Sequence, residues 1–356
     1  MGAIQTLWEQ LHACPALSWQ EQSSISILKH FFHSHTSLEV YPLAGGLIAA
    51  HREPAGPTVA VRADLDAIPN SQGKPYHGCG HDGHSAILAG LAQSLEGRRL
   101  GKSVLFVFQP AEEVGGGAQP LCQALLEQEG GIDAMLGFHN IPGYPEGKLL
   151  LRPGAMACAS EGLTVTAQGA QCHAAYPERG LNPGPLLCDL VLALPQLIQQ
   201  ANASGLLMAT LVELRLGNRN FGVSPGQGEL CLTLRAHRQQ DLQTLEESIR
   251  DYAKQHAHGV CCSFQLQDVF PDTTNDPGLL QRCREIIRKQ EIPYQELAEP
   301  MRWSEDFGWY AKRIPACFFG FGAGESWPEL HTEEYCFNTS LFQPCIHTLQ
   351  QLIQGL

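Results

Sequence analysis

The chain has 356 residues, of which 44% are hydrophobic and 17% are charged, and its formal net charge is −13. This length can hold two domains with a sizeable core, and the composition is typical of a folded soluble protein and not of a disordered one. The sequence has no basic stripe and no run of about 18 apolar residues, which argues against binding to nucleic acid and against a membrane span.

The thirteen cysteines do not form a regular framework. An odd number leaves one cysteine over in any full pairing, and a chain of this length does not need disulfides to be stable. We therefore expect reduced thiols and a cytoplasmic protein.

The N-terminal part of the chain alternates between helical and extended patterns. One or two helices are predicted within residues 1–35. The elements that follow are short apolar strands at residues 58–63, 104–108 and 134–138, and helices at residues 85–95 and 119–129. This alternation is typical of an α/β protein, and it predicts a mainly parallel sheet covered by helices on both faces.

Polar residues with metal-binding or acid–base chemistry follow these predicted strands. Asp66 comes after the first strand, Glu112 and Glu113 come after the second, and His139 comes directly after the third. Open α/β sheets place their functional sites at the carboxyl ends of the strands. We therefore expect these side chains to meet at one edge of the sheet.

The sequence HGCGHDGH at residues 77–84 is the strongest single indication of a metal site. Cys79 and His81 are two residues apart and are flanked by glycines, so the backbone can bend tightly and direct both side chains at one point. Zinc and similar cations take sulfur, imidazole nitrogen and carboxylate oxygen as ligands. Any one of these residues alone is often an ordinary core residue, but the set as a whole favours metal binding.

From about residue 157 the pattern changes. The predicted order is strand, helix, strand, strand, helix, strand, at residues 163–168, 182–202, 209–216, 229–236, 241–256 and 261–269. This order is that of a split βαβ, ferredoxin-like unit. We therefore predict an inserted α+β domain over residues 157–270. Residues 1–156 and 271–356 would then form the catalytic domain, in which the α/β pattern resumes with helices at 277–290 and 340–354 and a strand at 317–320.

Several motifs occur in order along nearly the whole chain: LHACP at residues 11–15, VRADLDA at 61–67, HGCGHDGH at 77–84, QPAEE at 109–113, GFHN at 137–140, HAA at 173–175, SEDF at 304–307, and His331. Together they resemble the two-metal N-acyl-amino-acid amidohydrolases, the group that contains hippurate hydrolase and the indole-acetyl-amino-acid hydrolases. The resemblance implies an inserted domain that acts as a lid and through which two copies often pair.

The resemblance also implies roles for individual residues. The ligands of two divalent metal ions would be Cys79, His81, Glu113, His139 and His331. Glu112 would be the general base, Asp66 would orient a ligand, and His173 would complete the site over the scissile bond. Five ligands exceed one tetrahedral set, which disfavours a purely structural zinc site. Thiolate favours zinc, although manganese, cobalt and nickel also fit such sites.

The lid region departs from the family pattern at two positions. Relatives carry Asn-Val-Ile-Pro where this chain has Gly-Val-Ser-Pro at residues 222–225, so the family asparagine is lost at Gly222. Asn218 or Asn220 would have to replace it, and Asn182 stands where relatives have an acidic residue. Asn220, with Asn218 as the open alternative, and Arg235 are the candidates for binding the substrate carboxylate.

These inferences predict a metal-dependent hydrolase that cleaves the amide bond of small N-acyl amino acids carrying an acetyl, benzoyl or aryl-acyl group. Adjacent Glu112 and Glu113 can divide the work, one bound to metal and the other free to move a proton. A carboxypeptidase or dipeptidase is the main alternative, since the same metal site hydrolyses both kinds of amide. A catalytically inactive binding protein is a further alternative. A missing metal ligand or general base would indicate such a protein, and none is missing here.

Overall fold

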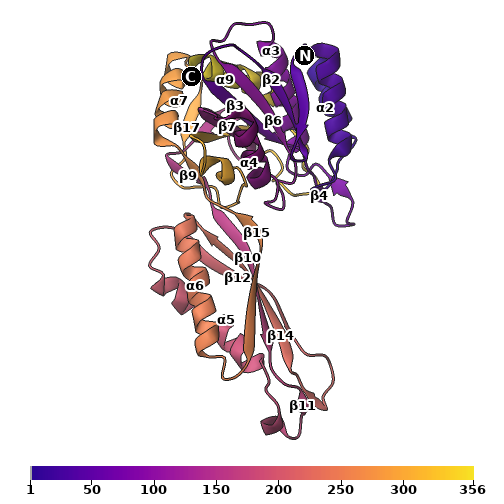
Figure 1. Ribbon diagram of the computed structural model, residues 1–356, viewed down its shortest axis with the longest axis vertical. Coiled ribbons are helices and arrows are strands. Elements are labelled where there is room, and N and C mark those ends of the chain that lie inside the picture. Colours follow the sequence, from indigo (N-terminus) through magenta and orange to yellow (C-terminus); the bar gives the residue numbers. More distant parts are fainter. Residues whose placement is uncertain (1) are drawn as a thin grey trace. The chain divides into compact units, whose positions relative to one another are not determined.

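The computed structural model describes residues 2–356, which form two compact units (Figure 1). Unit 1 comprises residues 2–156, Thr273–Met301 and Glu305–Leu356. Unit 2 comprises Ala157–Asp272 together with the short segment Arg302–Ser304. No helix among the described residues is both long enough and apolar enough to cross a membrane.

Unit 1 is built on an eight-stranded sheet of order β1-β2-β6-β3-β7-β18-β8-β17. The strands are β1 (Glu39–Leu43), β2 (Gly46–His51), β3 (Thr58–Asp64), β6 (Ser103–Gln109), β7 (Ala134–Pro142), β8 (Leu149–Leu151), β17 (Tyr294–Glu296) and β18 (Ala316–Gly324). The central strands β6, β3, β7 and β18 run parallel, whereas β1, β2 and β8 each pair antiparallel with a neighbour. The predicted mainly parallel sheet is confirmed.

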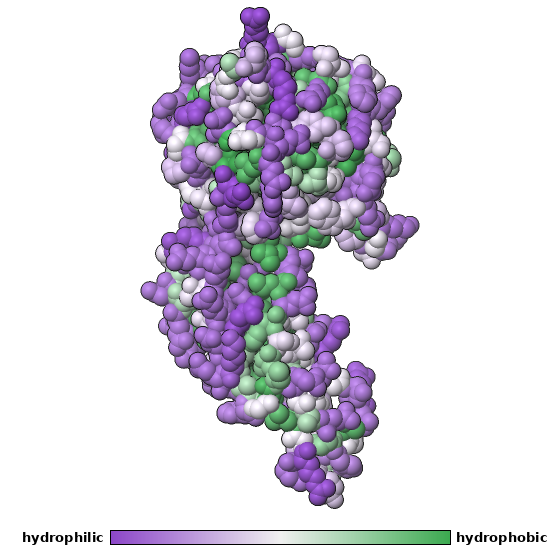
Figure 2. Space-filling model, in the orientation of Figure 1, coloured by the Kyte–Doolittle hydropathy of each residue, from purple (hydrophilic) through white to green (hydrophobic). Residues whose placement is uncertain are grey.

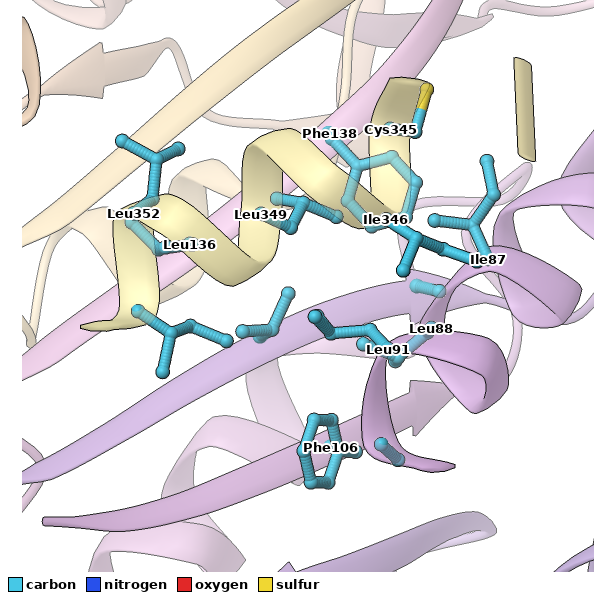
Figure 3. Packing of buried hydrophobic residues seen from close by; sticks show 14 of the residues in the cluster. Ile87, Leu88, Leu91, Phe106, Leu136, Phe138, Cys345, Ile346, Leu349 and Leu352 are labelled. Carbon is cyan, nitrogen blue, oxygen red and sulfur yellow. The ribbon is translucent and has the colours of Figure 1, made fainter. Parts of the chain in front are cut away.

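Helices bury both faces of this sheet. Five of them share one core with alternate strand positions: α1 (Gly2–His12), α2 (Gln22–His35), α3 (His81–Leu95), α7 (Pro277–Lys289) and α9 (Phe342–Gly355). Figure 3 shows Leu91 of α3 and Leu349 of α9 above Phe106 of the sheet, in the same buried cluster as Leu136. On the other face lie α4 (Ala118–Glu129) and α8 (Gly308–Ala311), which pack against each other. Because both faces are covered, β6 reads as an almost continuous apolar run.

Two observed elements include site residues that were predicted to lie beside them. Helix α3 begins at His81 and not at Ser85, so His81 belongs to its first turn. Strand β7 continues to Pro142, so His139 lies within the strand and not after its end. The hairpin of β1 and β2 was not predicted, because its partly exposed outer strand has no clear alternation of apolar and polar residues.

Unit 2 has a four-stranded antiparallel sheet of order β12-β14-β10-β15. Its strands are β10 (Ala159–Gln168), β12 (Leu207–Leu216), β14 (Gln227–Ala236) and β15 (Cys261–Phe270), and its helices are α5 (Gly184–Gln200) and α6 (Gln239–Gln255). Numbered along the chain, this order is 2-3-1-4, that of the predicted ferredoxin-like unit. The helices pack on one face of the sheet, and apolar residues form a band along the strands of this unit (Figure 2).

The remaining strands are short and pair outside the two main sheets. They are β4 (Ile68–Pro69) with β5 (Pro75–Tyr76), β9 (Gly154–Ala157) with β16 (Thr273–Asn275), and β11 (Cys172–His173) with β13 (Val223–Ser224). Two 3-10 turns, η1 (Pro177–Arg179) and η2 (Thr339–Leu341), complete the described structure.

Candidate metal centre

Several overlapping groups of potential metal ligands lie in unit 1, and within each group the donor atoms lie within 4.8 Å of one another. Among them are Cys79, His81, His139; Cys79, Glu113, His331; His81, Glu112, Glu113; and Asp64, His81, His84. The Cys79 Sγ is 3.4 Å from the Nε2 of His139. The Oε1 of Glu113 is 3.8 Å from the Nε2 of His81 and 3.7 Å from that of His331. The five residues predicted as ligands are therefore brought together in one place.

The backbone around Cys79 needs glycine. Gly80 has φ +91°, a left-handed conformation that glycine adopts without steric cost. A Cβ at this position would lie 2.5 Å from the hydroxyl of Tyr335 and 2.6 Å from the Nδ2 of Asn140, so any other residue would clash. The bend at Gly80 carries the chain from the loop with Cys79 into the first turn of α3, where His81 begins the helix.

His331 reaches the cluster from the loop between β18 and η2. Its backbone N–H donates a 2.8 Å hydrogen bond to the carbonyl of Gly78, beside Cys79. Its own φ is +64°, which is uncommon for a residue other than glycine. Backbone strain of this kind persists where the surrounding structure holds it and is frequent at functional sites.

The donor set suits divalent cations on physical grounds. The Nε2 of His81 and the Oε1 of Glu113 are buried and have no hydrogen-bond partner among the described residues. Buried polar atoms without partners are unfavourable and rare. A cation between them would satisfy both, and sulfur, imidazole and carboxylate ligands are those that zinc and related metals bind.

The pKa values of the acidic groups in the cluster also favour a bound cation. Burial and the neighbouring carboxylates of Glu305 and Glu113 hold the pKa of Glu112 well above its usual value. Burial likewise raises the pKa of Glu113 to about 7 and that of the Cys79 thiol well above its usual value. A bound cation reverses this tendency, because it favours the charged forms of both carboxylate and thiol.

Asp66 contacts two of the predicted ligands. Its backbone carbonyl is 3.0 Å from the Nδ1 of His81, and its Oδ1 is 3.3 Å from the same nitrogen. Its Oδ2 accepts hydrogen bonds from the backbone N–H of Glu113 and from the hydroxyl of Ser18. An oxygen on the far nitrogen of a ligand histidine fixes its orientation and tautomer. These contacts suit a residue that orients a metal ligand, and this role of Asp66 stays a prediction.

A second group of buried polar residues, which was not predicted as part of the site, contacts the cluster. The Nε2 of His84 accepts from the backbone N–H of Asn140 at 3.1 Å, while its Nδ1 lies 2.7 Å from Asp64. The side-chain amide of Asn140 donates to the carbonyl of Cys79, and its oxygen accepts from Tyr335. These contacts tie the Cys79 loop to β7 and to the segment before α9.

Arg62 also escaped prediction as a site residue. It is fully buried and forms ion pairs with Asp64, Glu305 and Asp306 at 2.8 to 2.9 Å. The backbone N–H of Asp306 in turn lies 3.4 Å from the Oε1 of Glu112. A charged residue inside an otherwise apolar strand was the signal that could have identified it, since a buried arginine needs acidic partners.

Three predicted site residues belong to unit 2. His173 lies exposed on β11, where its Nδ1 accepts from the backbone N–H of Ala175. The side-chain oxygen of Asn220 accepts from the backbone N–H of Gly222. Arg235 on β14 donates from Nη1 to the hydroxyl of Ser304 at 2.7 Å. None of the three belongs to the groups that hold the metal donors, and their roles at the substrate stay predictions.

Comparisons with known proteins agree with this fold and with a site for two metal ions. The model of peptidase family M20/M25/M40 matches residues 60–355. The chain is 29% identical to the N-acetylcysteine deacetylase of Bacillus subtilis (strain 168) over 338 residues, which cover 89% of this chain and 88% of that protein. It is 29% identical to the N-acetyldiaminopimelate deacetylase of Exiguobacterium sibiricum over 287 residues, 77% of each protein. A solved dinuclear metal-binding peptidase of the M20 family from Bacillus subtilis has a TM-score of 0.80 at 24% identity, covering 99% of this chain and 97% of that one.

Proposed function

The chain belongs to peptidase family M20/M25/M40, and we propose that it hydrolyses the amide bond of N-acyl amino acids whose acyl group is acetyl, benzoyl or another aryl-acyl group. As a member of this family it is a metal-dependent amidohydrolase that uses two divalent metal ions and acts on small molecules. Relatives named as deacetylases of N-acetylcysteine and N-acetyldiaminopimelate support the choice of N-acyl amino acids as the substrate class.

One observation carries the proposal. The donor atoms of His81, Glu112 and Glu113 lie within 4.8 Å of one another, although the resemblance makes only His81 and Glu113 metal ligands. This leaves one buried carboxylate beside the metals without a ligand role. A carboxylate in that position can take a proton from a water molecule and return it to a leaving group.

The proposed mechanism divides the work among residues of unit 1. Cys79, His81, Glu113, His139 and His331 would hold two divalent cations, which when bound lower the pKa of a water molecule and polarise the scissile carbonyl. Glu112 accepts the proton of the attacking water and then, as a carboxylic acid, delivers it to the nitrogen of the departing amino acid.

We propose zinc or manganese as the metal. Cys79 would supply a thiolate, which zinc binds well, whereas the carboxylate and imidazole ligands also suit manganese, cobalt and nickel. Coordination geometry and the availability of each metal also contribute to the selection among them.

Residues 157–270 are proposed to act as a lid. In this proposal His173 donates a hydrogen bond to the oxyanion that forms on the scissile carbonyl. Arg235 and Asn220 bind the free carboxylate of the substrate. A few loop residues near Gly154 and Pro271 would absorb the rotation that brings the lid to the substrate.

Pairing of two copies through unit 2 is also proposed. Strand β12 lies at an edge of its sheet, and four large apolar residues along it are more than a third exposed: Leu211, Val212, Leu214 and Leu216. An exposed apolar edge strand is a ready surface for pairing with another strand. A second copy would cover it.

A carboxypeptidase or dipeptidase remains the second candidate, since the same catalytic groups serve any amide. Purified protein should therefore be assayed with N-acetyl amino acids, N-benzoyl amino acids and dipeptides after loading with zinc or manganese, with metal content measured by elemental analysis. The proposal predicts two metal ions per chain and turnover of the N-acyl substrates. Turnover of dipeptides alone would favour the second candidate, and a metal content that never exceeds one ion would contradict the two-metal site.

A further inference from the structure

A cavity of about 560 Å³ in unit 1 has the predicted ligands Glu113 and His331 in its wall. Any group that occupies this cavity therefore lies next to the metal-binding side chains. Its volume falls in the range of about 300–1,000 Å³ that is usual for sites of small molecules. The cavity is thus large enough to hold part of the substrate whose amide is cleaved.

Most of the remaining wall is apolar. It is formed by Leu17, Ala67, Ile68, Pro69 and Val114. The first two belong to segments that pair as a parallel bridge, with the N–H of Ala67 donating to the carbonyl of Ala16 at 2.8 Å. Val114 directly follows Glu113 and is 40% exposed, although large apolar side chains are more often buried. An apolar ligand group that covers Val114 would gain from removing this surface from water.

The charges of the wall restrict what can bind. Its ionisable residues are Glu113 and His331, both predicted to be occupied by metal, and its other polar residues, Ser18 and Gln20, are uncharged. The wall contains neither lysine nor arginine, so a substrate carboxylate would find no cationic partner in it. An ammonium group would find no carboxylate other than that of Glu113. The cavity therefore favours an uncharged, apolar group.

In an N-acyl amino acid the free carboxylate belongs to the amino-acid part, and the acyl group is the uncharged part. Resting on the proposed function, we propose that this cavity binds the acyl group and that the enzyme prefers apolar acyl groups larger than acetyl. Leu17, Ile68 and Val114 are the residues that determine this specificity. The single methyl group of acetyl would leave most of the apolar wall uncovered, whereas each further buried methylene is expected to raise kcat/KM about fourfold.

The test compares acetyl, butanoyl, hexanoyl and benzoyl derivatives of one amino acid, with the metal-loaded enzyme. The expected result is a stepwise rise in kcat/KM that brings the hexanoyl substrate, with four more methylenes, roughly 250-fold above the acetyl substrate. Equal values for all four, or a fall with acyl size, would overturn the assignment of the cavity while leaving the proposed function intact. Failure to cleave any of them would overturn the proposed function itself.

Two variants locate the preference in this cavity. Ile68→Ala and Val114→Asn are each expected to lower the ratio of kcat/KM for hexanoyl to that for acetyl about tenfold. The matched control is Leu192→Asn, because Leu192 is 78% exposed on α5 of unit 2, and this variant should keep the wild-type ratio. Metal content equal to that of the wild type verifies that the variants are folded. A wild-type ratio in both cavity variants with full metal content would remove the cavity from acyl recognition.

Discussion

The carboxylate of Glu21 accepts a 2.8 Å hydrogen bond from the backbone N–H of Ala111, the residue that precedes Glu112. The same oxygen accepts from the backbone N–H of Trp19 at 3.0 Å. Both Ala111 and Trp19 have positive φ, +52° and +68°, a conformation that residues other than glycine adopt only at an energetic cost. One buried carboxylate therefore holds two strained backbone positions, one of which directly precedes Glu112.

We expect Glu21→Ala to lower kcat about tenfold, with KM and metal content near those of the wild type. The variant leaves the buried N–H of Ala111 without an acceptor, a cost of about 1–3 kcal/mol that the loop can relieve by shifting Glu112. Glu21→Gln keeps an acceptor oxygen and should restore most of the activity. Steady-state kinetics with elemental analysis checks both variants, and equal losses in the two would contradict a role through this hydrogen bond.

Glu112→Gln should keep metal and fold but lose most of its turnover. The amide has nearly the shape of the carboxylate but cannot accept the proton of the attacking water, and general-base contributions are about 10²–10⁴-fold. The measurement is kcat for an N-acyl amino acid with metal content determined in parallel. Near wild-type hydrolysis by Glu112→Gln would assign the proton transfer to another residue.

The stability of unit 2 should depend on the protonation of Glu161. This side chain on β10 is buried, and burial together with Glu246 raises its pKa to about 7, while Arg250 opposes the shift. Because the folded state holds the proton more tightly than the unfolded state, stability should fall as the pH rises from about 4.5 through 7. Allowing for partial solvent screening, the loss amounts to about 1–2 kcal/mol.

Glu161→Gln should remove this loss and raise the Tm at pH 8 while changing it little at pH 5. Thermal unfolding at the two pH values measures the difference. Glu247→Gln is the matched control, because Glu247 lies exposed on α6 of the same unit. A Tm gain of the same size at both pH values would show that the effect does not come from ionisation of Glu161.

The sequence predicted the centre of the fold better than its edges. Strands β3, β6 and β7 are covered on both faces, so their apolar runs stand out in the sequence. The outer strands β1 and β17 are short and partly exposed, and their patterns resemble those of loops. The fold class is confirmed because it depends mainly on the central strands and on the order of elements in the inserted unit.

Some residues of the candidate site could likewise be predicted from the sequence, and others could not. Cys79, His81 and Glu113 could be proposed from the sequence because their residue types and their motifs carry metal chemistry. The hydrogen bonds of Glu21 to Ala111 and of Tyr335 to Asn140 could not. Each joins residues far apart in the chain, and neither has a local pattern, because such contacts depend on how side chains pack after folding.

His173→Ala should lower kcat without changing metal content. The proposed contact of this side chain with the oxyanion exists only in the transition state, and removing one such donor typically costs about 10²–10³-fold in kcat. His173 is exposed on β11 and belongs to unit 2, so its loss should not disturb the donors of unit 1. An unchanged kcat in this variant would show that donors other than His173 stabilise the oxyanion.

Arg235→Ala should mainly weaken the binding of substrates that carry a free carboxylate. Arg235 already donates to Ser304 and to the carbonyl of Arg302, in the short segment of unit 2 that directly precedes Glu305. Two effects must therefore be separated: loss of a carboxylate partner and loosening of this segment. The first raises KM for acid substrates but spares their amidated analogues, whereas the second affects both alike. Steady-state kinetics on matched acid and amide pairs decides between them, and equal effects on the two would make Arg235 a structural residue of the segment and not a ligand of the substrate.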